Sequence, residues 1–271
     1  MKRIRRLEPS SCALQPLASY VAELAERNER PDWDLFRNNA RIAYEQLTEA
    51  LWKAQQGICA YCEIQIDLRS TLQVEHYLPK GGVPERHLAV DNLMACCGVS
   101  DNPGYSERRD AVGQGHYLPP TDRSKCCGAA KGNHDPTLKG TRVLDPRAIP
   151  SQDPLTGALP KLVGWRLLDD EIELVPDPNG CRRVGIDPEL VDETILTLKL
   201  NNPRHKRLRK TVRDALKKTV GLDLSQQSAA ENLSPNPVDN RISRYWSTVR
   251  HYFGDFAEDW LKTDEAKKAL C

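Results

Sequence analysis

The chain has 271 residues, a hydrophobic content of 39%, a mean hydropathy of −0.60 and a net charge of +1. This length allows one large domain or two modest ones, and no run of about 18 or more apolar residues is present to span a membrane. The charged start is not followed by an apolar segment, so we expect no secretory signal and a cytoplasmic location.

The first region, residues 1–57, is predicted to be helical. Apolar residues recur at helical spacing from Leu17 to Asn28, and Pro31 ends this pattern. A second helix is predicted from about Phe36 to Gln56, and Gly57 ends it.

The second region, residues 58–136, is rich in cysteine. The chain contains nine cysteines, and six of them lie between Cys59 and Cys127. A disulfide framework is typical of small secreted domains, which this chain does not resemble, so metal binding is favoured. Within this region, residues 71–77 are predicted to form a strand, and residues 98–125 form a long insertion rich in glycine and proline.

The third region, residues 137–271, alternates between predicted strands and helices. Strands over 162–168 and 171–175 are joined by Asp169-Asp170, and helices are predicted over 188–200 and 204–220. Residues 225–240 are predicted to be a loop. Residues 242–270 are predicted to form one or two helices whose aromatic face packs in the core or against a partner.

The cysteine spacing predicts a structural zinc site. Cys59-x-x-Cys62 places two thiolates where one tetrahedral zinc can bind both, and the doublets Cys96-Cys97 and Cys126-Cys127 can supply two more ligands. The alternative, a redox dithiol, requires a βαβ context that is absent around this pair. Spacing alone leaves open which cysteine of each doublet binds the metal.

Glu75-His76 at the end of the predicted strand is a candidate catalytic pair. A histidine titrates near neutral pH and can take a proton from water, and a carboxylate can bind Mg²⁺ or Mn²⁺. An isolated Glu-His pair is more often a half-buried strand end. Its position between a cysteine pair and Asp91-Asn92-Leu93 favours the catalytic interpretation.

These segments resemble the PtuB-type HNH endonucleases of Septu and retron-associated antiphage systems. The resemblance covers roughly residues 30–220 and includes the stretches 169–172 and 195–201, which precede a basic helix. The motifs that carry it are Cys59-Ala-Tyr-Cys62-Glu63, Val74-Glu75-His76-Tyr77-Leu78-Pro79-Lys80, Asn92-Leu93 and Cys127 followed by Lys131-Gly132.

The resemblance implies an α+β, mostly helical protein with a central zinc-stabilised ββα-metal domain of the HNH, treble-clef-like kind. It implies His76 as general base, Glu75 as a ligand of a catalytic Mg²⁺ or Mn²⁺, and Asn92 as the brace of the histidine loop. It also implies a PtuA-like ATPase partner of the ABC or SMC type. The zinc ligands that it selects are Cys59, Cys62, Cys97 and Cys127, with Cys96 and Cys126 in reserve.

One position departs from the family pattern. The last ligand of the catalytic metal usually follows the final zinc cysteine, and that residue is Gly128, which has no side chain. Asn133 and His134 are the nearest candidates to replace it.

A basic segment near residue 204 is a candidate nucleic-acid surface. Residues 199–218 contain nine basic residues and one acid, Asp214. Such a run is often only a solvated helix face, but a nuclease needs sequence-independent phosphate contacts. The residues predicted to make them are Arg204, Arg207, Lys210 and Lys80.

The leading functional prediction is therefore a metal-dependent HNH endonuclease that hydrolyses phosphodiester bonds in DNA, or in RNA such as tRNA. It would act as an effector of antiphage defence. The alternative is a catalytically weak zinc-binding adaptor, or nucleic-acid-binding subunit, of the ATPase complex. A cysteine-based redox protein is a third hypothesis, and zinc ligation would silence the thiols it needs.

Overall fold

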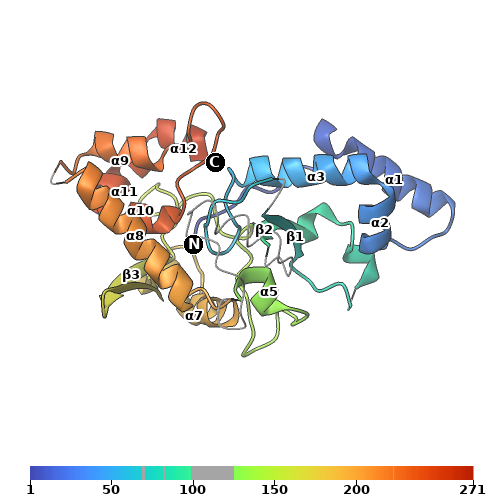
Figure 1. Cartoon of the computed structure of the whole chain (residues 1–271), viewed down its shortest axis with the longest axis horizontal. Helices are drawn as coiled ribbons and strands as arrows, with labels where there is room; N and C mark the ends of the chain where they lie inside the picture. Colours follow the sequence, from blue (N-terminus) through green and yellow to red (C-terminus); the bar gives the residue numbers. More distant parts are fainter. Residues whose placement is uncertain (69–70, 82, 99–124, 222, 271) are drawn as a thin grey trace, which may run out of the picture.

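The structure is a computed structural model that describes residues 1–68, 71–81, 83–98, 125–221 and 223–270. Viewed along its shortest axis, the molecule is elongated (Figure 1). Helices α1, α2 and α3 lie at one end, the later helices lie at the other, and two short strands with helix α5 lie between them (Figure 1). Among the described residues, no helix combines the length and the apolar character needed to cross a bilayer.

The N-terminal region is helical, as predicted, but its second helix is divided. Asp32 caps α2 by accepting a hydrogen bond from the Leu35 backbone N–H at 2.8 Å, so this helix begins three residues before the predicted start. Ala40 has φ −113° and ψ 53°, outside the helical region, and separates α2 from α3. The elements are η1 (Cys12–Leu14), α1 (Gln15–Glu26), α2 (Trp33–Asn39) and α3 (Arg41–Ala54).

An aromatic cluster joins these helices. The ring centroid of Phe36 lies 5.2 Å from that of Tyr20 and 6.3 Å from that of Tyr44. Trp33 packs against both Phe36 and Tyr44, at 5.7 and 5.9 Å. Because aromatic pairs at these separations add to ordinary apolar burial, the cluster fixes α2 against α1 and α3.

The central region contains an antiparallel pair of strands followed by a short helix. Strands β1 (Leu72–His76) and β2 (Leu93–Cys97) pair with His76 opposite Leu93, which confirms the strand predicted over 71–77. The short helices η2 (Pro84–Arg86) and η3 (Val90–Asn92) lie in the connection, and α5 (Cys127–Lys131) follows. Almost all of the predicted insertion over 98–125 lies outside the described residues.

The C-terminal region contains the predicted hairpin and helices. β3 (Val163–Leu168) and β4 (Glu171–Pro176) pair antiparallel, and Asp169 and Asp170 adopt positive φ at the turn. The prediction of a loop over 225–240 was wrong for residues 226–233, because Ser225 and Ser228 form a reciprocal capping box that starts a helix, and it is confirmed for residues 234–240. The helices are α6 (Pro178–Arg183), α7 (Pro188–Thr197), α8 (Pro203–Thr219), α9 (Gln226–Leu233), α10 (Trp246–Phe253), α11 (Asp255–Leu261) and α12 (Asp264–Leu270).

The predicted aromatic face near the C-terminus packs in the core. Trp246, Phe253 and Trp260 are each at most 2% exposed, whereas Phe256 is 42% exposed. One cluster of buried apolar residues includes members of all three predicted regions. The region boundaries at residues 57 and 136 stay a prediction.

Candidate active site and metal centre

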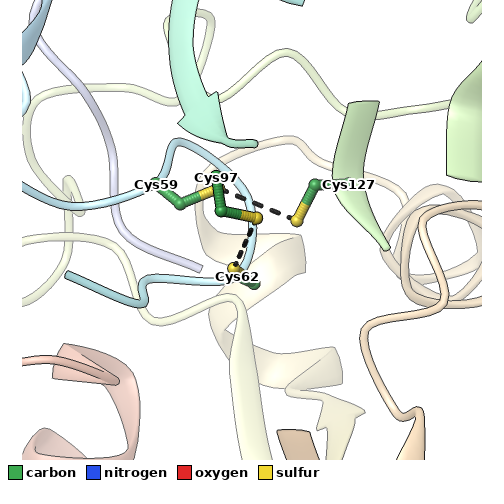
Figure 2. Close-up of side chains that lie close together, drawn as sticks. All are labelled: Cys59, Cys62, Cys97 and Cys127. Atoms are coloured by element: carbon green, nitrogen blue, oxygen red, sulfur yellow. Dashed lines mark hydrogen bonds between the residues drawn. The ribbon is translucent and has the colours of Figure 1, made fainter. Parts of the chain in front are cut away.

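Four cysteines come together between β2, α5 and the turn after α3 (Figure 2). The Sγ atoms of Cys59 and Cys127 are 3.7 Å apart, as are those of Cys62 and Cys97, and all four lie within 4.8 Å of one another. Thiolates bound tetrahedrally at about 2.3 Å from zinc lie about 3.8 Å from one another. The donor set and its spacing therefore fit a zinc ion.

Backbone hydrogen bonds hold this arrangement. The Cys59 N–H donates to the Ile64 carbonyl at 2.9 Å, which closes the turn that contains the Cys-x-x-Cys pair. The Ala60 N–H donates to the Ala95 carbonyl at 3.1 Å and ties this turn to β2. The Cys127 N–H donates to the Leu198 carbonyl at 2.9 Å, which ties α5 to the C-terminal region.

The two reserve cysteines, Cys96 and Cys126, lie outside the group of four. Cys126 forms a second group of possible metal ligands with Cys62 and His205, and its Sγ is 3.1 Å from His205 Nε2. The other ring nitrogen of His205 is 2.7 Å from the Tyr245 hydroxyl. Cys96 belongs to neither group among the described residues. Sequence reasoning missed His205, because nothing near it in the chain marks it as a neighbour of cysteine.

His76 ends β1 in a defined orientation. The residue is 7% exposed, and its ring packs edge-on against Trp33 of α2, with the centroids 4.7 Å apart. His76 Nε2 lies 3.0 Å from the His87 carbonyl, and because a carbonyl only accepts, Nε2 carries the hydrogen. Burial lowers the pKa of His76 to about 4. The imidazole is therefore neutral near pH 7, with Nδ1 left as an acceptor.

Glu75 forms a buried ion pair with Lys131. Lys131 Nζ is 2.9 Å from Glu75 Oε1, and it donates to the His76 and Tyr77 carbonyls at 2.9 and 3.1 Å. The Lys131 side chain is 1% exposed. Burial raises the pKa of the Glu75 carboxyl, and the ammonium of Lys131 opposes that rise. Lys131 thus holds both the carboxylate and the backbone that follows β1.

The packing explains why residue 128 is glycine. A Cβ atom at Gly128 would lie 2.1 Å from Glu75 Oε2, so no side chain fits while the carboxylate has this position. Glu75 thus occupies the space that a side chain at residue 128 would need.

Asn92 clamps the loop that follows His76. Its Oδ1 accepts from the Leu78 N–H at 2.7 Å, and its Nδ2 donates to the Leu78 and Arg86 carbonyls at 3.1 and 3.0 Å. The side chain is buried, with 1% of the residue exposed. This clamp fixes the segment whose His87 carbonyl orients His76.

A cavity of about 240 Å³ opens beside Glu75 and His76. Glu75, His76, Lys131 and Asn133 line it, together with Trp33 and Arg37 of α2. His134 is exposed and does not line the cavity, so of the two candidate ligands only Asn133 is positioned beside Glu75. The contributions of Trp33, Arg37 and His87 were not visible in the sequence, because helical spacing does not reveal which distant strand a helix meets.

Three cations of α8, Lys206, Lys210 and Arg213, form ion pairs within the chain. Lys206 Nζ lies 2.9 Å from Glu171 and 3.2 Å from Glu173, and Lys210 Nζ lies 2.8 Å from Asp214. Neither Arg204, Arg207 nor Lys210 lines the cavity beside His76, whereas Lys80 does. The prediction that these residues contact nucleic acid stays a prediction.

The geometry thus defines a class of site, in which two antiparallel strands and a short helix present a histidine and a carboxylate beside four grouped thiols. Over 92 residues, 31% of the chain, the sequence is 34% identical to the "Retron Ec83 putative HNH endonuclease" of Escherichia coli. The match spans 36% of that relative, about a third of its length. No protein-family model matches the chain. The similarity supports the HNH part of the sequence prediction, and the narrower PtuB-type assignment stays a prediction.

Proposed function

We propose that this chain is a metal-dependent HNH endonuclease that hydrolyses phosphodiester bonds of DNA, with RNA, including tRNA, as the alternative substrate. The observation that carries the proposal is the pairing of Glu75 and His76 at the end of β1, opposite α5 and beside the four-cysteine group. The similarity to the retron relative supports the same chemistry.

His76 would act as the general base. Its Nε2–H donates to the His87 carbonyl, which leaves Nδ1 to take a proton from the attacking water. The lowered pKa keeps this nitrogen unprotonated at neutral pH, and Trp33 limits rotation of the ring. Asn92 contributes indirectly, by holding the loop that carries the His87 carbonyl.

Glu75 and Asn133 are the residues proposed to hold a catalytic Mg²⁺ or Mn²⁺, because both line the cavity and both offer the oxygen ligands such ions prefer. The ion would supply positive charge against the phosphate and its leaving oxygen. Lys131 would keep Glu75 near this position until an ion competes for its carboxylate. His134, exposed nearby, is the second candidate ligand.

The four-cysteine group is proposed to hold one structural zinc. Cys59, Cys62, Cys97 and Cys127 have the spacing of a closed tetrahedral site. Such a site contributes directly to folding, because it joins segments far apart in the chain.

A role in antiphage defence beside a PtuA-like ABC or SMC-type ATPase is part of the proposal. It is supported by the sequence resemblance and by the retron in the name of the similar protein. Co-expression with a neighbouring ATPase, followed by size-exclusion chromatography, tests for a hetero-oligomer. Separate elution of the two proteins under all nucleotide conditions would count against it.

The alternative is a catalytically weak zinc-binding adaptor, or nucleic-acid-binding subunit, of the ATPase complex. Two observations favour it: Gly128 offers no ligand, and Glu75 is already paired with Lys131. An adaptor would keep its partner and its zinc yet leave a plasmid uncut in Mg²⁺ or Mn²⁺.

A plasmid-nicking assay with His76→Ala tests the nuclease. We expect cleavage to fall by about 10² to 10⁴-fold, the usual value of general-base assistance, while zinc content stays unchanged. His251→Ala is the matched control, because His251 also packs on a tryptophan, with its ring centroid 4.5 Å from that of Trp165. Cleavage by the His76 variant as fast as by the parent would reject the proposed role of His76, and no cleavage by the parent would favour the adaptor.

A further inference from the structure

We propose that Arg37 of α2, together with Lys80, binds the phosphodiester backbone of the strand to be cut. This inference rests on the proposed nuclease function and assigns a substrate contact to a helix outside the HNH-like segment. Both residues line the cavity that contains Glu75 and His76.

The orientation of α2 follows from Trp33. Residues four apart lie on the same helix face, so the face that turns Trp33 onto the His76 ring also turns Arg37 toward the cavity. Trp33 is 5% exposed, whereas the Arg37 side chain is 50% exposed. The helix therefore has a fixed anchor, Trp33, and an exposed cation, Arg37, one turn apart.

The position of Lys80 is set by the same residue that orients His76. His87 Nε2 lies 2.7 Å from the Lys80 carbonyl, and the His87 carbonyl accepts from His76. His87 thus connects the candidate base, His76, to Lys80 through two hydrogen bonds. A strand held by Lys80 and Arg37 would lie against His76.

The two cations share one weakly held acid. Asp34 lies 3.4 Å from Lys80 Nζ and 3.6 Å from Arg37 Nη2, and its side chain is 59% exposed. Exposed ion pairs of this kind contribute little, so a phosphate can displace the carboxylate. The guanidinium offers a planar fork that matches phosphate oxygens, and Lys80 adds a point charge.

The charge of the cavity favours an anion. Arg37, Lys80 and Lys131 line it, and Glu75, already paired with Lys131, is the acid among the described lining residues. On α8, in contrast, Lys206 lies 2.9 Å from Glu171 and is 19% exposed. A phosphate arriving at Lys206 would have to break these closer pairs.

Binding of fluorescent DNA and RNA duplexes tests the inference. Measurements use the full chain in a His76→Ala background, which prevents cleavage, over a range of salt concentrations. Arg37→Ala should weaken binding by about tenfold and reduce the slope of log affinity against log salt by about one, because one phosphate contact is lost. Asp34→Asn should strengthen binding, an effect of opposite sign that damage to the fold would not produce.

Arg41→Ala is the matched control. Arg41 belongs to the adjacent helix, is 84% exposed, pairs with Glu45 at 2.8 Å and does not line the cavity. Unchanged affinity and salt slope in Arg37→Ala, an equal loss in Arg41→Ala, or no binding by the parent at low salt would overturn the inference. In the chain with His76 intact, Arg37→Ala should raise KM with little change in kcat. Failure of the nuclease proposal is a separate result, namely no cleavage by the parent.

Discussion

The two small sheets of this molecule use the same device for different purposes. In the first, Asn92 bonds both backbone groups of Leu78, at 2.7 and 3.1 Å, just after β1. In the second, Asn201 bonds both backbone groups of Leu174 in β4, at 2.8 and 2.8 Å. Each asparagine replaces a missing partner strand for one residue.

The surroundings of the two sheets differ. The ion pair beside β1 is buried, with Lys131 1% and Glu75 16% exposed, whereas in the pair across β3 and β4 Arg166 is 65% exposed. The first sheet ends at a cavity lined by a histidine and a carboxylate. An asparagine clamp and a histidine packed on a tryptophan occur beside both sheets, so these are structural features. The buried ion pair and the cavity beside the first sheet are what indicate a chemical role.

The largest expected effect is on the metal centre. Cys127→Ser should abolish zinc binding and destabilise β1 and β2 by several kcal/mol, because metal binding is coupled to local folding. Cys181→Ser is the control, since Cys181 is equally buried near β3 and its Sγ lies 3.4 Å from the Leu162 carbonyl. Metal analysis with amide exchange of both sheets measures the difference. Retention of zinc by Cys127→Ser, or equal damage from Cys126→Ser, would mean that another thiol is the ligand.

Replacing the two asparagines separates an effect on cleavage from an effect on stability. Asn92→Ala and Asn201→Ala should each lower the free energy of unfolding by about 1–3 kcal/mol for every buried backbone group left unpaired. Cleavage should fall only in Asn92→Ala, because its loop carries the carbonyl that orients His76. Denaturant unfolding and the plasmid assay read the two effects. Equal loss of cleavage in both variants would show that the first sheet has no special role.

A methyl group at residue 128 should affect activity more than stability. Its Cβ would meet Glu75 Oε2 at 2.1 Å, so Gly128→Ala must displace the carboxylate that Lys131 holds. A displacement of about 1 Å at a reacting centre can cost about 10²-fold in rate, which is the fall we expect. Gly81→Ala is the control, because no atom lies within 4 Å of its added Cβ. Full activity of Gly128→Ala would place the metal away from Glu75.

The sequence predicted the local elements of the site better than their assembly. The strand ending at His76 and the cysteine pair were predictable, because the alternation of apolar and polar residues and the Cys-x-x-Cys spacing are local patterns. The burial of Lys131 was not, since a lysine is ordinarily exposed and only three-dimensional packing brings it to Glu75. The same holds for α2: its amphipathic spacing predicts a buried face, but not that Trp33 meets His76.

His251, which packs on Trp165, also predicts that the stability of the protein depends on pH. Burial lowers the pKa of His251 below its ordinary value near 6.5. As the pH falls through that value, the unfolded chain binds a proton that the folded chain excludes, so the free energy of unfolding decreases. His251→Gln should therefore lose less stability than the parent between pH 7 and pH 5, as measured by urea unfolding. Parallel curves for the two proteins would contradict the shifted pKa.

The smallest expected effect concerns α8, which packs on the second sheet. Lys210 lies 2.8 Å from Asp214 and 3.2 Å from Asp170, so its charge is already compensated. Lys210→Ala should change duplex affinity by about twofold or less, since a partly buried, paired cation contributes little to counterion release. Arg207, which makes no ion pair among the described residues, should matter more when replaced by alanine. If Lys210→Ala weakened binding as much as Arg37→Ala, the second sheet and α8 would form a nucleic-acid surface of their own, and the contrast between the two regions would fail.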